Sequence, residues 1–473
     1  MTASTEWRRL SPRMLLVRPV HEVLGQLPLL IGAVVLGTAT GNMMYSLAIL
    51  ALMVLYGVAT WFTTAYRIDA DQIQRREGVL KRTVLSLPRN RIRSVSTDAR
   101  LLHRVLGLTV VKVSTGREGG GDTEFALDAL PVTEVAGLRA LLLDETRVSD
   151  VGPVEQVLAR WQPSWLRYSP LSFTGLAMIA AAFGVVYQTG AVAALENSEL
   201  TRAGLDAAER VGVVATVAIV VLVLLALSVL LSVARSLLTY GNLLLSRRDE
   251  ALHLEHGLLR LREHTYDTAR LRGGTLREPL LVRLFGGARL DAVMTGVNGA
   301  GEASLLLPPC PRATAHRVLG DLTSPAVLAP LHPHGSVATR RRWTRAFVLP
   351  LLLAAVFAVV GVPVWVWVVL GVFCVASAGI AADRARALGH RVDAQWLVAR
   401  AGSIDRRRDC IAAAGVIGWT VRQTVFQRRA GVATLIAATA AGVKGYRILD
   451  VPADIAWAVA AEASPWVAAG LAD

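Results

Sequence analysis

The stretch LGQLPLLIGAVVLGTATGNMMYSLAILALMVLYGVATWF, from Leu24 to Phe62, runs for 39 residues without one Asp, Glu, Lys, Arg or His. A continuous helix of this length would be about 58 Å long, whereas the hydrocarbon core of a membrane is only about 30 Å thick. The stretch must therefore fold back on itself, and Gly41-Asn42 is the expected turn because both residues tolerate tight backbone angles. The sequence predicts a hairpin of two membrane-spanning helices over residues 23–63.

Two further segments follow the same pattern. Residues 346–383 are almost free of charge and break at Gly361-Val362-Pro363, where a helix would have to stop. Residues 171–235 hold two apolar runs that a polar connection separates. Six transmembrane helices in three hairpins are therefore expected. Buried core helices of a soluble protein are the alternative, but a soluble core rarely offers six apolar runs flanked by arginine.

Basic residues gather at one end of the predicted hairpins. They precede the first span, follow the second and precede the fifth: Arg8, Arg9, Arg13, Arg18, Arg67, Arg75, Arg76, Arg340, Arg341, Arg342 and Arg345. Because such flanks stay on the cytoplasmic side, both termini and all large polar segments are expected in the cytoplasm. The net charge of +14 is thus assigned to the anionic inner leaflet of the membrane and not to nucleic acid.

The polar segments are interpreted as three copies of one domain. The chain aligns with itself without a gap over about 45 residues when residue 66 is matched to residues 245 and 390. The copies share two glycines and an arginine: Gly78, Gly257 and Gly402; Arg104, Arg283 and Arg428; Gly107, Gly286 and Gly431. A gapless match of this length, each time after an apolar hairpin, indicates an internal repeat.

Each copy opens with alternating apolar residues around its first shared glycine, as in RIDADQIQRREGVLKRTVLSL from Arg67. This pattern predicts two strands joined by a tight turn, since glycine supplies the backbone freedom that the turn needs. Another strand is expected after the shared Arg-x-x-Gly. A helix should end each copy, where Pro131, Pro311 and Pro452 suit a first helical turn.

These patterns divide the whole chain into hairpins, domains and connecting segments. The hairpins are 23–63, 171–235 and 346–383; the domains are 64–150, 236–326 and 384–473; the rest are a basic N-terminal segment (1–22), a linker (151–170) and a basic linker with Pro and His (327–345). Each domain then has about 80 to 100 residues, an ordinary size for a small domain.

These features resemble bacterial pleckstrin-homology-like (PH-like) membrane proteins of the YdbS and YdbT type. The resemblance rests on the hairpin before each domain, the strand-glycine-strand opening, and stretches such as RVLGL at Arg104 and FQRRAGVA at Phe426. Three domains on six spans look like the larger, YdbT-type member. The second copy departs most, with Gly273-Gly274 and Pro279 in its middle.

The resemblance implies several further properties. Each domain would be a small antiparallel β-barrel or curved sheet closed by a C-terminal helix. The protein would lie in the bacterial inner membrane and would have a partner, a smaller two-span membrane protein with one PH-like domain. Its role would be in defence of the cell envelope against bacteriocins.

Sequence signals for catalysis or metal binding are weak. No Gly-x-x-x-x-Gly-Lys-Ser/Thr loop exists, and the three cysteines are too scattered for a disulfide framework or a C-x-x-C site. Three histidines of the second copy, His253, His256 and His264, have no Cys partner and are more often solvated than metal-bound. We therefore expect no enzyme activity, no cofactor and no metal.

Basic residues follow the first turn in every copy: Lys81 and Arg82, Arg260 and Arg262, and Arg406, Arg407 and Arg408. One interpretation is a strand edge that solvated charges protect from aggregation. Another is contact with an anionic surface, to which each Lys or Arg contributes about 1 kcal/mol. A specific headgroup site is the third, because the resemblance to eukaryotic PH domains places lipid phosphates at a comparable hairpin.

The repeat and the lack of catalytic motifs favour a membrane-anchored scaffold whose three domains bind a protein partner. A transport accessory or lipid-handling protein is the alternative, although the predicted spans lack the charged residues that usually line a transport pathway. An enzyme acting on lipid headgroups ranks last, since no pair of carboxylates, nucleophile or metal cluster recurs at one membrane depth.

Overall fold

The computed structural model describes most of the chain. The described residues are 4–14, 44–69, 71–78, 82–89, 92, 94–99, 101–114, 125–143, 155–172, 174–188, 212–295 and 304–470. The first arm of the first expected hairpin, its turn at Gly41-Asn42 and the polar connection inside the second hairpin lie outside these ranges, as does Lys81.

Long apolar helices occupy the described parts of the expected hairpins. They are α3 (Met44–Thr63), α6 (Thr174–Gln188), α9 (Val213–Tyr240), α12 (Gly335–Val360) and α13 (Val364–Ala387). Within the described residues, α9, α12 and α13 are long and apolar enough to cross a membrane. The structure thus supplies three candidate spans, and the number of six stays a prediction.

The third hairpin turns where the sequence predicts. α12 ends at Gly361, which has a left-handed φ of 72° and donates its N–H to the carbonyl oxygen of Phe357 over 3.0 Å. Pro363 then precedes α13. Glycine is favoured at this position because residues with a Cβ rarely adopt a left-handed conformation.

The two helices of the second hairpin approach each other closely at one glycine. Gly175 of α6 donates its backbone N–H to the Oγ of Ser232 on α9 over 2.8 Å. A Cβ at Gly175 would lie only 1.9 Å from the carbonyl oxygen of Ser228. Small residues let helices pack this closely in lipid, so the contact fixes α6 against α9.

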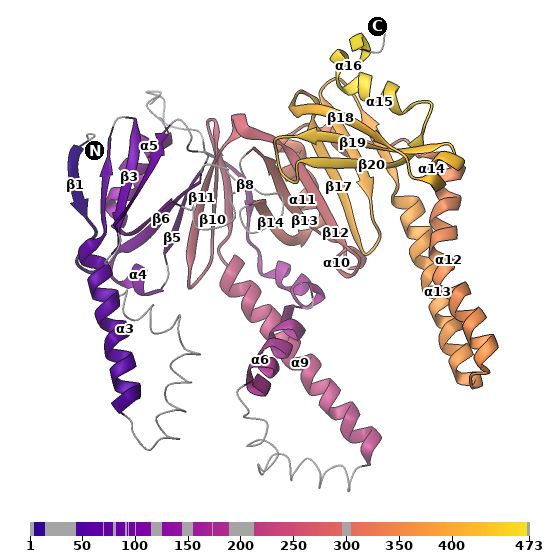
Figure 1. The fold of residues 1–473 in the computed structure, drawn as a ribbon, viewed down its shortest axis with the longest axis horizontal. Helices are drawn as coiled ribbons and strands as arrows, with labels where there is room; N and C mark the ends of the chain where they lie inside the picture. The colour runs from indigo at the N-terminus through magenta and orange to yellow at the C-terminus, as the bar shows by residue number, and fades with distance from the viewer. Residues whose placement is uncertain are drawn as a thin grey trace. The chain divides into compact units, whose positions relative to one another are not determined.

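The described strands form four antiparallel sheets (Figure 1). The first has the order β1 (Ser4–Arg9), β2 (Ala65–Ile68), β3 (Gln72–Glu77) and β4 (Thr83–Pro88). The second has β7 (Phe125–Pro131), β6 (Leu108–Ser114), β5 (Ser94–Ala99), β11 (Leu261–Asp267), β10 (Ala251–His256), β9 (Leu244–Arg248) and β8 (Glu155–Arg160). The third has β14 (Leu305–Pro311), β13 (Gly287–Met294), β12 (Leu271–Pro279), β17 (Asp405–Ala412), β16 (Trp396–Ala401) and β15 (Gly389–Val392). The fourth has β18 (Val416–Arg422), β19 (Val432–Thr439) and β20 (Gly445–Pro452).

Short helices recur at matching places in the repeats. The helices that follow the fourth strand of each repeat are α4 (Leu101–Val105), α10 (Leu280–Leu284) and α14 (Val425–Arg429). The helices that end each repeat are α5 (Val132–Leu143), α11 (Arg312–Leu322) and α15 (Ala456–Ala463). One more helix, α16 (Pro465–Gly470), follows α15. The helices α4, α10 and α14 occupy aligned residues of the three copies, so local structure repeats with the sequence.

Neighbouring repeats share sheets, which the sequence analysis did not predict. After the hairpin, each repeat gives three strands to one sheet and three to another: β2–β4 and β5–β7, β9–β11 and β12–β14, β15–β17 and β18–β20. The fourth strand of the first repeat, β5, pairs with the third strand of the second, β11. In the same way β12 of the second repeat pairs with β17 of the third. We call these two pairings the first and the second junction.

A further strand precedes the first two hairpins. β1 pairs with β2, and β8 pairs with β9, so the strands before and after each hairpin are neighbours in a sheet. Before the third hairpin, His332 forms a single bridge with His390. These residues lie in the segments 1–22, 151–170 and 327–345, which the sequence assigned to a terminal segment and linkers. Short strands whose partner lies beyond a hairpin leave little periodic signal.

The first and third repeats each have a core between their two sets of three strands. In the first repeat, the buried Ile73 of β3 and Val95 of β5 belong to one cluster with Leu138 of α5. In the third repeat, Leu397 of β16 and Leu435 of β19 are buried in one cluster that also includes α15. Both domains are therefore antiparallel sheets closed by a C-terminal helix, as expected for a PH-like domain.

The chain divides into two compact units, Met1–Arg160 with Gly241–Arg270, and Trp161–Tyr240 with Leu271–Asp473. The division after Arg270 falls inside the segment 236–326, which the sequence assigned to one domain. Strand pairing is the reason, because β9–β11 share a sheet with β5 and β12–β14 share a sheet with β17.

Candidate functional site

The basic residues after the turn of the second repeat lie against the first repeat. Arg260 donates from Nε to Oδ1 of Asp98 on β5 over 2.5 Å, and its Nη2 pairs with Oδ2. Arg262 stands opposite Asp98 in the β5–β11 ladder. Burial acts to raise the pKa of Asp98, but the hydrogen bond and charge of Arg260 outweigh it and hold the pKa below its usual value.

The basic residues of the third repeat also have partners inside the protein. Arg406 binds Asp383 of α13 with an N–O distance of 2.5 Å. Arg407 binds Asp405 at 3.0 Å. Arg408 is only 8% exposed and donates to a backbone carbonyl oxygen over 2.6 Å. Each of these cations is thus neutralised or buried within its own chain.

Several basic residues named in the sequence analysis thus have contacts within the protein. The sequence names seven basic residues as possible contacts with an anionic surface, which stays a prediction, and Arg260, Arg406 and Arg408 are held in contacts within the protein. The sequence could not show this, because the acidic partners of Arg260 and Arg406 and the carbonyl partner of Arg408 are more than twenty residues away in the chain. Arg82 is exposed, and for it the surface contact stays a prediction.

Both junctions use the same register and the same kind of ion pair. Asp98 of β5 stands opposite Arg262, and the aligned Arg277 of β12 stands opposite Arg407. At the first junction the fourth strand supplies the carboxylate of Asp98, as described above. At the second, the fourth strand supplies Arg277, which binds Asp405 at 2.6 Å. Asp405 aligns with Arg260, so the two charges have exchanged strands while their complementarity is kept.

The arginine shared by the repeats also reaches into the next repeat. Arg104 donates to the carbonyl oxygen of Leu258, beside the turn glycine of the second repeat, over 2.6 Å. Arg283 binds Asp383 at 2.7 Å, and Asp383 accepts a hydrogen bond from Ser403. Ser403 aligns with Leu258. The same arginine therefore contacts, directly or through Asp383, the same turn of the following repeat.

The shared glycines have similar backbone conformations in all three repeats. The φ angles are 119°, 108° and 101° at Gly78, Gly257 and Gly402, and 67°, 75° and 65° at Gly107, Gly286 and Gly431. Residues with a Cβ rarely adopt these angles. The third shared arginine, Arg428, is exposed.

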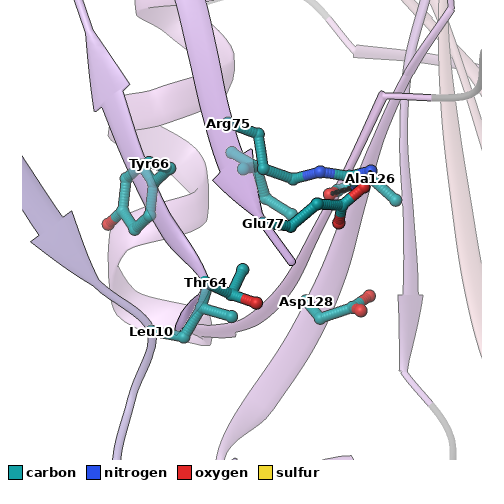
Figure 2. Close-up of a pocket in the computed structure, with 8 residues that line it drawn as sticks. Leu10, Thr64, Tyr66, Arg75, Glu77, Ala126 and Asp128 are labelled. Atoms are coloured by element: carbon teal, nitrogen blue, oxygen red, sulfur yellow. Dashed lines mark hydrogen bonds and ion pairs between the residues drawn. The ribbon is translucent and has the colours of Figure 1, made fainter. Parts of the chain in front are cut away.

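A small pocket lies in the first repeat (Figure 2). It is lined by Leu10, Thr64, Tyr66, Arg75, Glu77, Ala126, Leu127 and Asp128. Its cavity volume of about 20 Å³ has room for a water molecule and is far below the roughly 300 to 1,000 Å³ of small-molecule sites. Arg75 donates to the carbonyl oxygen of Ala126 over 2.5 Å and to Glu77 over 2.8 Å, so its charge is already balanced.

In the described parts of the chain, His256 is buried and not solvated as the sequence suggested, and Cys310 and Cys410 are buried as well. No group of three His, Cys, Asp or Glu residues there could hold a metal ion. Burial, followed by the charges of His256 and Arg262, lowers the pKa of His264 to about 4. Burial likewise raises the pKa of the Cys310 and Cys410 thiols to about 12, which makes them unreactive.

The sequence analysis did not identify the acidic residues that bind the arginines at the two junctions. Asp98, Asp383 and Asp405 are far in sequence from the arginines of other repeats that they bind. One signal was available: the aligned positions of Asp98 and Arg260 hold Arg277 and Asp405, so the pair reverses its charges together. Such paired reversal indicates a contact between the two positions.

Comparison with known proteins gave one family match. The family model described as Bacterial PH domain matches residues 21–146 and 346–463, together just over half of the chain. Each matched range includes a predicted hairpin and most of the domain that follows it. No curated protein and no solved structure matched. The chain belongs to the bacterial PH domain family.

Proposed function

We propose that this chain is a non-enzymatic, membrane-anchored scaffold that binds protein partners through its PH-like domains. One observation carries the proposal: the repeats already bind one another through sheet edges, with an ion pair at the same place in each junction. Strand addition supplies backbone hydrogen bonds for affinity, and the side chains along the edge supply specificity. A domain that recognises its neighbour in this way is suited to recognise a related domain in another protein.

The charges also favour a protein ligand over a lipid headgroup. A headgroup site would need free cations after the first turn of each repeat, as a phosphate is bound by Arg or Lys. In the structure Arg260, Arg406 and Arg407 are instead paired with carboxylates. General attraction to an anionic inner leaflet remains part of the proposal for the exposed Arg82 and the arginines that flank the helices.

The finer parts of the proposal come from the resemblance and the arginine flanks. Six spans in three hairpins hold the chain in a bacterial inner membrane, and both termini and all three domains are cytoplasmic. The partner is a smaller two-span membrane protein with one PH-like domain. The assembly contributes to defence of the envelope against bacteriocins.

Purification of the full chain in a mild detergent tests the scaffold proposal. A tagged chain expressed at its natural level should retain one partner in stoichiometric amount through two purification steps. A chain with Arg447→Glu, a change at an exposed residue of β20 away from both junctions, serves as the matched charge control. Absence of any stoichiometric partner, together with absence of self-association, would contradict the proposal.

A further inference from the structure

The last fourth strand, β18, has no neighbour beyond it in the described structure. β5 and β12, the fourth strands of the first two repeats, each pair on that side with the third strand of the next repeat. β18 pairs only with β19 among the described strands. The third repeat therefore ends with the edge that its two predecessors use for binding.

The β18 edge keeps the local form of the edge that β17 occupies on β12. β12 has a register irregularity between Leu271 and Gly273, and β18 has one at the aligned positions, Val416 and Gly418. A Cβ at Gly273 would lie 1.9 Å from the carbonyl oxygen of Cys410 on β17. At Gly418 the nearest atom to such a Cβ is the Cβ of Ala438, at 3.9 Å. Among the described residues, none fills beside Gly418 the space that β17 fills beside Gly273.

Two exposed arginines at this edge correspond to arginines that bind carboxylates at the second junction. Arg422 of β18 aligns with Arg277, and Arg428 aligns with Arg283. Arg277 and Arg283 bind carboxylates of the third repeat. Neither Arg422 nor Arg428 has a side-chain partner among the described residues, and both are exposed. A strand that docks here would therefore be expected to bring acidic side chains.

A second copy of this chain does not supply them. The corresponding third strand of a second copy would be β4, at the open edge of the first described sheet. The residue that aligns with Asp405 is Lys81, and Arg82 follows it. In the register of the second junction, Lys81 would take the place beside Arg422 that Asp405 takes beside Arg277, and such neighbouring like charges repel each other. Such head-to-tail contacts would also continue from copy to copy into a filament, which the charge mismatch opposes.

We propose that the β18 edge docks the third strand of a PH-like domain from a different protein, with a carboxylate at the position aligned with Asp405. The register is that of the second junction, so Arg422 faces the position aligned with Arg407, and Gly418 faces the position aligned with Ile411. This inference rests on the proposed scaffold function and specifies its partner by fold and by charge.

A charge-exchange experiment on the full chain in detergent tests both the edge and the charge rule. Lys81→Asp places the carboxylate that the edge requires two residues before β4, and it should tighten self-association about tenfold over the parent chain. Arg422→Asp should do the same, because it recreates the arrangement of Asp98 and Arg260. The double variant restores like charges and should stay monomeric. Arg429→Asp, an exposed change on α14, is the matched control and should have no effect.

Disulfide trapping fixes the register in the same experiment. In a Cys374→Ser background, one chain carries Thr420→Cys and a second carries Leu85→Cys, the positions that correspond to Thr275 and Asp409 of the second junction. A disulfide should form between the two chains when either single charge variant is present and not with the parent charges. Sedimentation velocity reports the mass in parallel.

Two outcomes would overturn the proposal. If a disulfide forms between chains with parent charges, a second copy of the chain occupies the edge. If no disulfide forms with either charge variant, although circular dichroism shows that both are folded, the edge accepts no strand. Either result can occur while the scaffold function holds, because the partner purification that tests this function does not depend on which surface the partner uses.

Discussion

Asp98 has a side chain that is 11% exposed and lies beside the guanidinium of Arg260, which is 39% exposed. Removing one partner of such a pair leaves the other partly buried without its counter-charge. Asp98→Asn should therefore lower the free energy of unfolding by about 1 kcal/mol, a modest value because solvent screens Arg260. Chemical unfolding of the detergent-solubilised chain, followed by tryptophan fluorescence, measures it.

The pair of Arg248 with Glu155 is the control for this prediction, since both side chains are more exposed. Glu155→Gln should leave the unfolding midpoint unchanged. The sign of the pH effect at Asp98 follows from its lowered pKa. The stabilisation is present above the usual pKa of 3.8 and is lost as the pH falls through the lower folded value. Equal effects of the two substitutions would contradict this account.

His390 and His334 form a hydrogen-bonded chain that requires His334 to be neutral. His334 Nδ1 lies 2.7 Å from the carbonyl oxygen of Leu449 and must donate to it, so its Nε2 accepts from Nδ1 of His390 at 2.8 Å. Burial first, and then the charges of His334 and His332, lower the pKa of His390 to about 4. Protonation of His334 would place two N–H groups against each other, and protonation of His390 would put a charge in a buried position.

Stability should consequently fall when the solution is acidified. Between the usual pKa of 6.5 and the folded value of about 4, the unfolded chain binds more protons at His390 than the folded chain does. The unfolding temperature should drop as the pH goes from 7 to 4.5, and His390→Gln should reduce this slope. His332→Gln, at an exposed position, should retain it. An unchanged slope in His390→Gln would remove this histidine as the cause.

At the scale of elements, the second junction depends on a close approach of β17 to β12. Gly273 has a φ of 140°, and a Cβ there would meet the carbonyl oxygen of Cys410. Gly273→Ala should therefore destabilise the unit by about 2 to 3 kcal/mol, through backbone strain and separation of the two strands. Hydrogen exchange of the backbone amides of β12 and β17 should become faster in this variant.

Gly418→Ala is the matched substitution at the aligned position of β18. Its new Cβ would have only Ala438 nearby, at ordinary contact distance. The unfolding free energy of the chain on its own should stay within about 0.5 kcal/mol of the parent value. Equal destabilisation of the two alanine variants would contradict the conclusion that the edge of β12 is occupied and the edge of β18 is open.

Elements with local signals could be predicted from the sequence, whereas pairings between distant strands could not. Uncharged runs placed α12 and α13, and the shared glycines marked turns at Gly257 and Gly402 because only local backbone geometry is involved. The pairing of β5 with β11 depends on which strand meets the open edge of β5, and the alternation of apolar and polar residues does not identify that strand. The acidic partners of the arginines were unpredictable for the same reason.

For the whole molecule, the arginine flanks predict one orientation in the membrane. Cysteines introduced singly at Arg82, Arg248 and Arg429, one exposed position in each repeat, should react with a membrane-impermeant maleimide only after the cells are opened. A cysteine at Ala203, in the predicted external connection of the second hairpin, should react in intact cells. Labelling of any repeat from outside would exclude a cytoplasmic location of all three domains.

The shared sheet also sets an order of events during synthesis. Asp98 leaves the ribosome 162 residues before Arg260. At roughly 5 to 20 residues per second, β5 waits about ten to thirty seconds for β11, while the second hairpin is synthesised. During that interval its open edge is available to any neighbouring nascent chain. Polysomes translating this message would therefore benefit from spacing or from a chaperone that covers the edge until the second repeat arrives.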